Sequence, residues 1–188
     1  MAIVKANYTR SRRKIKASVR YIQHRPGKDG ERISRSLFGI DGSMSREDAY
    51  KLIDEAPKGT NFFRIVISPD PKREDNGRDL NLREITQQTM LALAKQVKQP
   101  LSYIGAIHDD HAAHRHVHVV AMTKGKLTRQ TFQVLRDTAT GAAQFQRLER
   151  DAARGIVRVQ DGSARTRLRE GSGTAQLGSG STGVWAIS

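Results

Sequence analysis

The sequence predicts an α+β fold, with helices packed on an antiparallel-rich central sheet. Segments with the two-residue alternation of strands are intermixed with segments of helical spacing. Two strand-like segments, residues 101–107 and 117–122, follow one another with no helix between them, which argues against a purely parallel βαβ sheet. Residues 1–155 are expected to form one domain. Residues 156–188 are basic and then rich in Gly and Ser, which predicts a flexible tail.

The predicted strands combine alternation with β-branched and aromatic residues. The clearest is residues 62–67, Phe-Phe-Arg-Ile-Val-Ile, which Pro69 ends. Gly39 and Gly42 mark a turn after a short strand. The full set is residues 3–8, 33–40, 62–67, 101–107 and 117–122.

The predicted helices follow from apolar spacing and end signals. Residues 13–24 place apolar side chains at spacings of four and three, and Ser45 with acids after it is typical of a helix N-terminus. A polar helix is expected at residues 128–154, with Gly141 as a candidate interruption. The clearest helix is residues 82–97, whose apolar stripe is Ile85, Met90, Leu91, Leu93 and Ala94.

The chain is strongly basic, with a net charge of +14 and a pI of about 10.6. Such a charge predicts attraction to a polyanion, and nucleic acid is the first candidate. Between residues 1 and 40 there are eleven Lys or Arg against two acids; a solvated basic face is the alternative. DNA binding that weakens steeply with salt is expected. The predicted DNA contacts are Arg12, Arg13, Lys14, Lys16, Arg20, His24, Arg25 and Lys28.

The composition also excludes several classes of site. The chain has no cysteine, so disulfides, thiolate ligands and cysteine nucleophiles are excluded. No apolar run approaches the roughly 18 residues that a membrane span needs, and the first residues are too polar for a secretion signal. A cytoplasmic protein without membrane insertion is therefore expected.

Five of the six histidines lie between residues 108 and 118. His116 and His118 share a face if this segment is a strand, and His108 can join them from the neighbouring strand. Three neutral nitrogens with open positions are typical of a catalytic metal site, and by affinity they suit zinc, copper or nickel. His111 and His114 are expected to contact DNA or to be solvated.

Two further residue types complete the candidate site. Asp110 can share the face of His108 and fix an imidazole tautomer, whereas Asp109 would point away. With DNA as the inferred partner, a tyrosine is a candidate nucleophile. Tyr21 is preferred because it lies on a predicted helix within the most basic stretch, and Tyr8 is the next candidate.

Three motifs resemble those of relaxases, the mobilisation nucleases of the MobA/VirD type in the HUH endonuclease superfamily. Residues 19–24 (Val-Arg-Tyr-Ile-Gln-His) are similar to the catalytic-tyrosine motif, and residues 63–68 before a long helix are similar to the second motif. His108 and Asp110 followed by His116 and His118 resemble the three-histidine metal motif. The resemblance covers about residues 3–154.

The resemblance implies a mechanism in which a metal on the three histidines polarises a phosphate that Tyr21 attacks. It implies site- and strand-specific nicking and rejoining of single-stranded DNA at a transfer origin, through a 5′-phosphotyrosyl intermediate, for conjugation or mobilisation of plasmid or mobile-element DNA. Asp110 matches the acidic position of the family. The family implies Mg²⁺ or Mn²⁺, and the three-imidazole donor set leaves Zn²⁺ as an alternative. Its partners are relaxosome accessory proteins and type IV secretion coupling proteins.

Two other functions fit the same residues. A non-catalytic basic DNA-binding protein with a vestigial or structural histidine metal site would bind DNA without a covalent adduct. A metal-dependent hydrolase that uses water would cleave DNA without retaining it.

Overall fold

The computed structural model describes residues 1–26, 30–109 and 114–155. The predicted tail at residues 156–188 lies outside the described residues. Among those described, six strands form one antiparallel sheet in the order β1-β4-β6-β5-β2-β3. The strands are β1 (Ile3–Thr9), β2 (Leu37–Gly39), β3 (Gly42–Met44), β4 (Asn61–Ser68), β5 (Ser102–His108) and β6 (His116–Thr123).

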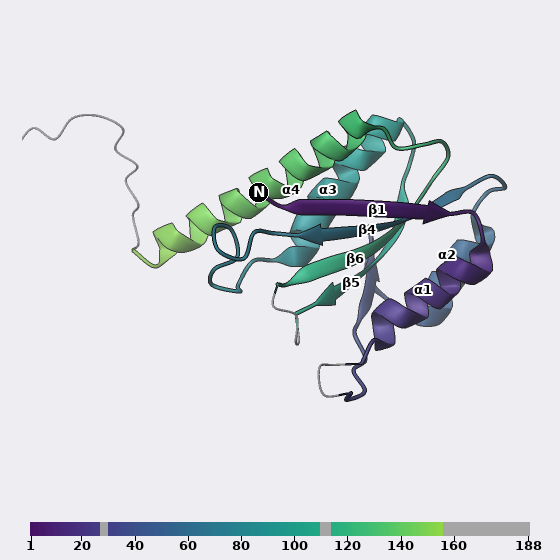
Figure 1. Cartoon of the computed structure of the whole chain (residues 1–188), viewed down its shortest axis with the longest axis horizontal. Helices are drawn as coiled ribbons and strands as arrows, with labels where there is room; N and C mark the ends of the chain where they lie inside the picture. Colours follow the sequence, from purple (N-terminus) through teal and green to yellow (C-terminus); the bar gives the residue numbers. More distant parts are fainter. Residues whose placement is uncertain (27–29, 110–113, 156–188) are drawn as a thin grey trace, which may run out of the picture. The chain divides into compact units, whose positions relative to one another are not determined.

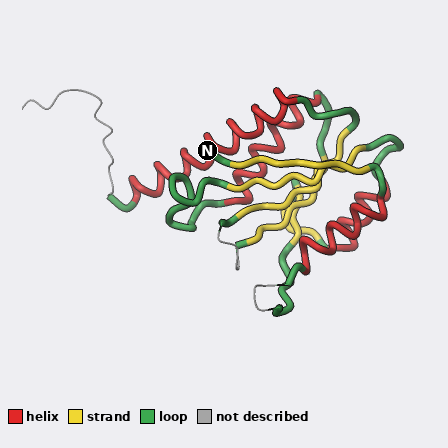
Figure 2. The backbone as a smooth tube through the Cα atoms, in the orientation of Figure 1, coloured by secondary structure: helices red, strands yellow, loops and turns green. Residues whose placement is uncertain are grey.

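Four helices of the described chain cover the two faces of this sheet. They are α1 (Arg12–His24), α2 (Arg46–Glu55), α3 (Leu82–Val97) and α4 (Arg129–Ala153). Helices α1 and α2 lie on one face and α3 and α4 on the other (Figures 1 and 2). The prediction of an α+β fold with helices packed on an antiparallel sheet is confirmed.

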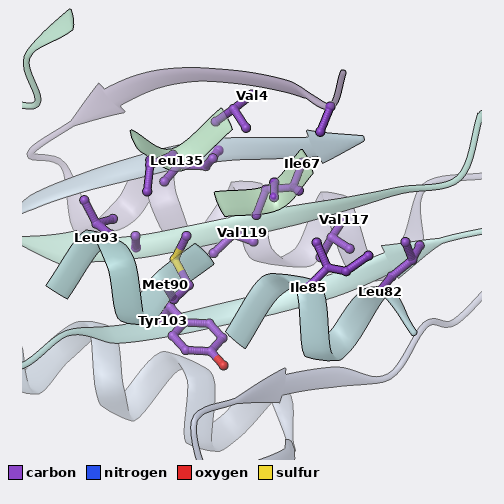
Figure 3. Packing of buried hydrophobic residues seen from close by; sticks show 14 of the residues in the cluster. Val4, Ile67, Leu82, Ile85, Met90, Leu93, Tyr103, Val117, Val119 and Leu135 are labelled. Atoms are coloured by element: carbon purple, nitrogen blue, oxygen red, sulfur yellow. The ribbon is translucent and has the colours of Figure 1, made fainter. Parts of the chain in front are cut away.

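Alternation along the strands divides the core into two layers. On β6, Val117 and Val119 pack under α3 and α4, whereas Val120 and Met122 pack under α1 and α2. Figure 3 shows the first layer, where Val117 lies beside Ile85 of α3 and Val119 lies beside Met90. Both faces of the central strands are therefore buried, which holds β4, β5 and β6 rigidly between the helix layers.

Three sequence predictions about the elements are wrong in detail. The strand expected at residues 33–40 begins only at Leu37 and continues into a hairpin, because Gly42 takes the left-handed conformation (φ 115°) that the turn requires. Helix α4 passes Gly141 without interruption, since buried alanines on either side pack it against α3 and β1. Leu91, assigned to the buried stripe of α3, is 56% exposed.

None of the helices in the described part of the chain is both long enough and apolar enough to cross a membrane.

Candidate active site

The three predicted ligands meet on the face of the sheet that α1 covers. His116 and His118 lie two residues apart on β6 and so share a face. His108 is the last residue of β5 and lies directly opposite His116 in the β5–β6 register. Each of the three imidazoles offers a nitrogen within 4.8 Å of the others. We call His108, His116 and His118 the histidine triad.

Two backbone carbonyls orient the rings of the triad. Nε2 of His108 lies 2.8 Å from the carbonyl oxygen of Ile22, and Nδ1 of His116 lies 2.9 Å from that of His114. Because a carbonyl can only accept, we assign the ring protons to these two nitrogens. With this assignment, Nδ1 of His108 and Nε2 of His116 are the nitrogens that could act as metal ligands.

His118 supplies the third nitrogen from a buried position. Its Nε2 is shielded from solvent and has no hydrogen-bond partner within the described residues. Burial, with the added repulsion of His108 and His116, lowers the pKa of His118 to about 3, so the ring is neutral at pH 7. A buried nitrogen without a partner is unfavourable, and a bound cation would satisfy it. The triad therefore fits a metal ion.

Tyr21 and His118 of the triad line one pocket. The pocket has a volume of about 260 Å³ and lies between α1, β1 and β4. Tyr21 is 56% exposed, and its neighbour Ile22 is the residue whose carbonyl accepts from His108. We call this cavity the Tyr21 pocket; its lining is Lys5, Ala6, Asn7, Ser18, Tyr21, Ile22, Arg64, Val66 and His118.

The other three tyrosines are placed differently. Tyr8 packs against Phe63, whose side chain belongs to the core layer under α3 and α4. Tyr103 is buried and donates to the carbonyl of Gly39. Tyr50 lies beside Tyr21 in an adjoining pocket that no triad histidine lines, and its hydroxyl donates to the carbonyl of Lys16. Among the pockets that the described residues form, the Tyr21 pocket contains a triad histidine, and those lined by Tyr8 and Tyr50 do not.

The sequence interpretation missed four polar residues of this pocket, which are Lys5, Asn7, Ser18 and Arg64. Lys5 and Asn7 project from β1, and Arg64 lies opposite Asn7 on β4. Arg64 carried a usable signal, since it is a single charge inside an apolar strand and two-residue alternation separates it from Phe63 and Ile65. The side chains of Lys5 and Arg64 give the pocket a positive lining that attracts an anionic phosphate.

Three of the residues predicted to contact DNA have partners within the chain. The guanidinium of Arg12 donates to the carbonyls of Ile53 and Ala56 at the end of α2. Lys16 forms an ion pair with Asp54 at 2.6 Å. His24 accepts from Arg46 at 3.0 Å.

The remaining predicted contacts that can be placed are exposed on or just after α1. Arg20 lies next to Tyr21 and lines the adjoining pocket with it. Lys28 falls outside the described residues. The exposed set is Arg13, Lys14, Arg20 and Arg25.

The loop between β4 and α3 holds both sides of the histidine segment. Asp75, which is buried, pairs with Arg115 at 3.2 Å, directly before His116. Arg78 donates to the carbonyl of Asp109 at 2.9 Å, directly after His108. These bonds fix the ends of β5 and β6 from which the ligands project.

Other predicted residues of the histidine segment are only partly placed. Asp110 and His111 lie outside the described residues, so their predicted roles stay predictions. His114 is exposed and contributes its carbonyl to the orientation of His116.

Comparisons with models of protein families, with curated proteins and with solved structures find no match for this chain. The resemblance to relaxases therefore stays a prediction.

Proposed function

We propose that this chain is a metal-dependent nuclease that nicks and rejoins single-stranded DNA, with Tyr21 as nucleophile and the histidine triad as metal site. The observation that carries the proposal is the Tyr21 pocket, in which an exposed phenol, a triad histidine and two cations face one cavity. A phenol beside a three-nitrogen site suits attack on a phosphodiester. The strongly basic chain supports a nucleic-acid substrate.

A divalent ion bound by the triad would act as a Lewis acid on a phosphate oxygen. The side chains of Lys5 and Arg64 hold the phosphate in the pocket by charge. The phenol oxygen of Tyr21 forms a bond to phosphorus and gives up its proton, while the bond from phosphorus to the 3′ oxygen breaks and that oxygen takes up a proton. The products are a 5′-phosphotyrosyl link and a free 3′ hydroxyl, and the reverse reaction rejoins the strand.

The hydrogen bond from His108 to the carbonyl of Ile22 has a defined part in this proposal. It links the triad to the residue next to the nucleophile, so α1 cannot shift along the sheet without disturbing His108. Ile22 itself is buried against the sheet. Catalysis by proximity requires such fixed positions, because small displacements of the reacting groups cost large factors in rate.

The process served is also part of the proposal. In the family that the sequence resembles, this reaction starts the transfer of plasmid or mobile-element DNA from an origin. Relaxosome accessory proteins and a type IV secretion coupling protein are the partners that this process requires.

Labelled oligonucleotides test the reaction. Single strands of random sequence are incubated with the protein and Mn²⁺, with the label at the 3′ end in one sample and at the 5′ end in the other. The proposal predicts a labelled protein band in denaturing gels for the 3′ label, and a shortened free fragment for the 5′ label. Chelator should remove both products.

Variants of two neighbouring tyrosines assign the nucleophile. Tyr21→Phe should abolish the adduct, because it removes the attacking oxygen and leaves the ring. Tyr50→Phe, in the adjoining pocket, should retain it. An adduct that persists in Tyr21→Phe would contradict the assignment. Cleavage without an adduct would favour the water-using hydrolase, and binding without cleavage would favour the non-catalytic DNA-binding protein.

A further inference from the structure

A second pocket lies on the other face of β1. Residues Ala6 and Tyr8 alternate with Lys5 and Asn7 along this strand, so the Tyr8 side faces the layer of α4, away from the triad. The cavity has a volume of about 190 Å³. We call it the Tyr8 pocket; its lining is Ala6, Asn7, Tyr8, Asn61, Phe63, Lys126, Leu127 and Phe132.

Aromatic rings give this pocket its character. Tyr8 is 53% exposed, whereas Phe63 beneath it is 5% exposed, and their ring centroids lie 5.5 Å apart. Phe132 of α4 contributes a third ring to the lining. The volume is below the range of drug-sized ligand sites and suits a single heterocycle. An exposed aromatic ring in such a cavity is typical of base stacking.

The Tyr8 pocket adjoins the Tyr21 pocket. Ala6 and Asn7 line both cavities, so the two meet at β1. Within the described residues β1 is an edge strand, with β4 as its neighbour. An extended ligand that lies in one pocket can therefore pass over this edge into the other.

Cations lie on both sides of this edge. Lys5 and Arg64 line the Tyr21 pocket, and Lys126 lines the Tyr8 pocket. Arg10 adds its guanidinium close by, because its Nε donates to Asn61 of the same lining at 2.9 Å. These four cations complement a polyanion rather than an apolar peptide.

We propose that the Tyr8 pocket binds one unpaired base of the single-stranded DNA whose phosphate lies in the Tyr21 pocket, with the strand crossing the edge of β1. The choice of DNA rests on the proposed function; the stacking itself rests on the pocket. Base stacking on an aromatic ring is tolerant of sequence, so this subsite anchors the strand without selecting the base.

The affinity for a fluorescein-labelled oligothymidylate of about 20 nucleotides tests the proposal. Loss of one stacked base corresponds to roughly a 5-fold to 100-fold weaker affinity, which is the expected effect of Tyr8→Ala. Tyr8→Phe should bind as the wild type does, because it keeps the ring. Lys126→Ala should lower the number of counterions released on binding, read from the salt dependence of the affinity, by about one. Tyr8→Ala should leave this number unchanged.

Matched controls separate stacking from other effects. Phe145→Ala removes an aromatic ring of α4 that is 60% exposed and lies in neither pocket lining, so it should not change affinity. Tyr8→Leu keeps an apolar contact with Phe63 and should weaken binding as Tyr8→Ala does, which covers the case in which the alanine variant loses stability. Duplex DNA should be insensitive to Tyr8, because its bases are paired.

Two results would overturn the subsite: wild-type affinity in Tyr8→Ala, or an equal loss in Tyr8→Phe. Tighter Tyr8-dependent binding of oligouridylate than of oligothymidylate would overturn the assignment to DNA. The measurement needs no cleavage. A Tyr8 effect without a covalent adduct would sink the proposed function and leave the subsite, whereas an adduct without a Tyr8 effect would do the reverse.

Discussion

At the scale of single residues, the site depends on three imidazoles that must be neutral to bind a metal. His118 is the most constrained of them, because burial lowers its pKa to about 3 and its Nε2 has no hydrogen-bond partner in the described chain. An unpartnered buried nitrogen destabilises the fold, and the metal ion proposed above would relieve this cost by taking the nitrogen as a ligand. A residue of this kind is better explained by metal binding than by packing.

The stability of the metal-free protein should depend on pH through His118. The pKa of this side chain is about 6.5 in the unfolded chain and about 3 in the folded protein. Between these values the unfolded chain binds a proton that the folded chain does not. The free energy of unfolding therefore has its full value, as far as His118 is concerned, above pH 6.5, and it falls as the pH drops towards 3. Thermal unfolding in chelator, from pH 7 to about pH 4.5, should show this fall.

Two variants check that the fall belongs to His118. His118→Phe should flatten the profile, and replacement of the exposed His24 by Asn should not. The scan stops above the range of carboxylates such as Asp48, whose pKa the hydrogen bonds from Ser45 hold below 3.8. A profile that is unchanged in His118→Phe would contradict the neutral, buried assignment.

Metal affinity should depend on the ring of His116 and not on that of His114. His116→Ala removes a ligand and should weaken Mn²⁺ or Zn²⁺ binding by more than tenfold in calorimetric titration. His114→Ala is the matched control, because it keeps the carbonyl that orients His116. Three nitrogen donors favour transition ions over Mg²⁺, so Mg²⁺ should bind most weakly of the three. Equal losses in the two variants would argue against this ligand set.

At the scale of elements, α1 carries cations with two separate roles. Its first turns attach to α2, through Arg12 at the last carbonyls of that helix and Lys16 at Asp54. Its last turns present Arg20 and Tyr21 beside the pocket. The charge pattern of the sequence could not separate these roles, since a cation that caps a neighbouring helix is identical in sequence to one that binds a phosphate.

Two substitutions on α1 should therefore have opposite effects. Arg12→Ala should lower the free energy of unfolding by about 1 kcal/mol, because two carbonyls at the end of α2 lose a charged donor. Its affinity for single-stranded DNA should stay near that of the wild type. Arg20→Ala should keep the stability and weaken DNA binding, with a salt dependence reduced by about one ion. Denaturant unfolding measures the stability, and fluorescence anisotropy measures the affinity for DNA. A loss of affinity in Arg12→Ala together with a loss of stability in Arg20→Ala would contradict these two roles.

The loop from β4 to α3 is a second element with an unexpected role. In the sequence it is a polar stretch rich in Asp, Lys and Gly. In the structure Asp79 accepts from Arg147 and Arg154 of the α4 end, and Asp75 holds Arg115 beside the triad. This loop therefore ties α4 and the histidine segment together. Its ion pairs join residues about 40 to 75 positions apart, which local sequence patterns do not encode.

At the scale of the whole molecule, periodicity predicted most of the fold. The alternation in residues 117–122 and the helical spacing of Ile15, Val19 and Ile22 are imposed by burial, and the structure buries them as expected. The strand at residues 33–40 was mispredicted because glycine turns, not apolar alternation, define that hairpin.

The candidate site was predictable to a similar degree. The strand period brought His116 and His118 together, and the neighbouring strand supplied His108 at the directly opposite position. Lys5 and Asn7 could not be assigned to it, because their membership depends on β1 pairing with β4 across about 60 residues of chain. The same pairing creates the edge at which the two pockets meet.

In the proposed reaction, Tyr21 becomes covalently linked to DNA. The most direct measurement is mass spectrometry of the adduct after nuclease trimming and trypsin digestion, since trypsin cleaves after Arg20 and releases a peptide that begins with Tyr21. We predict a 5′-nucleotide mass on the Tyr21 side chain, formed only with metal present. The same mass on Tyr8 or Tyr50, or cleaved DNA with no modified tyrosine, would contradict this prediction.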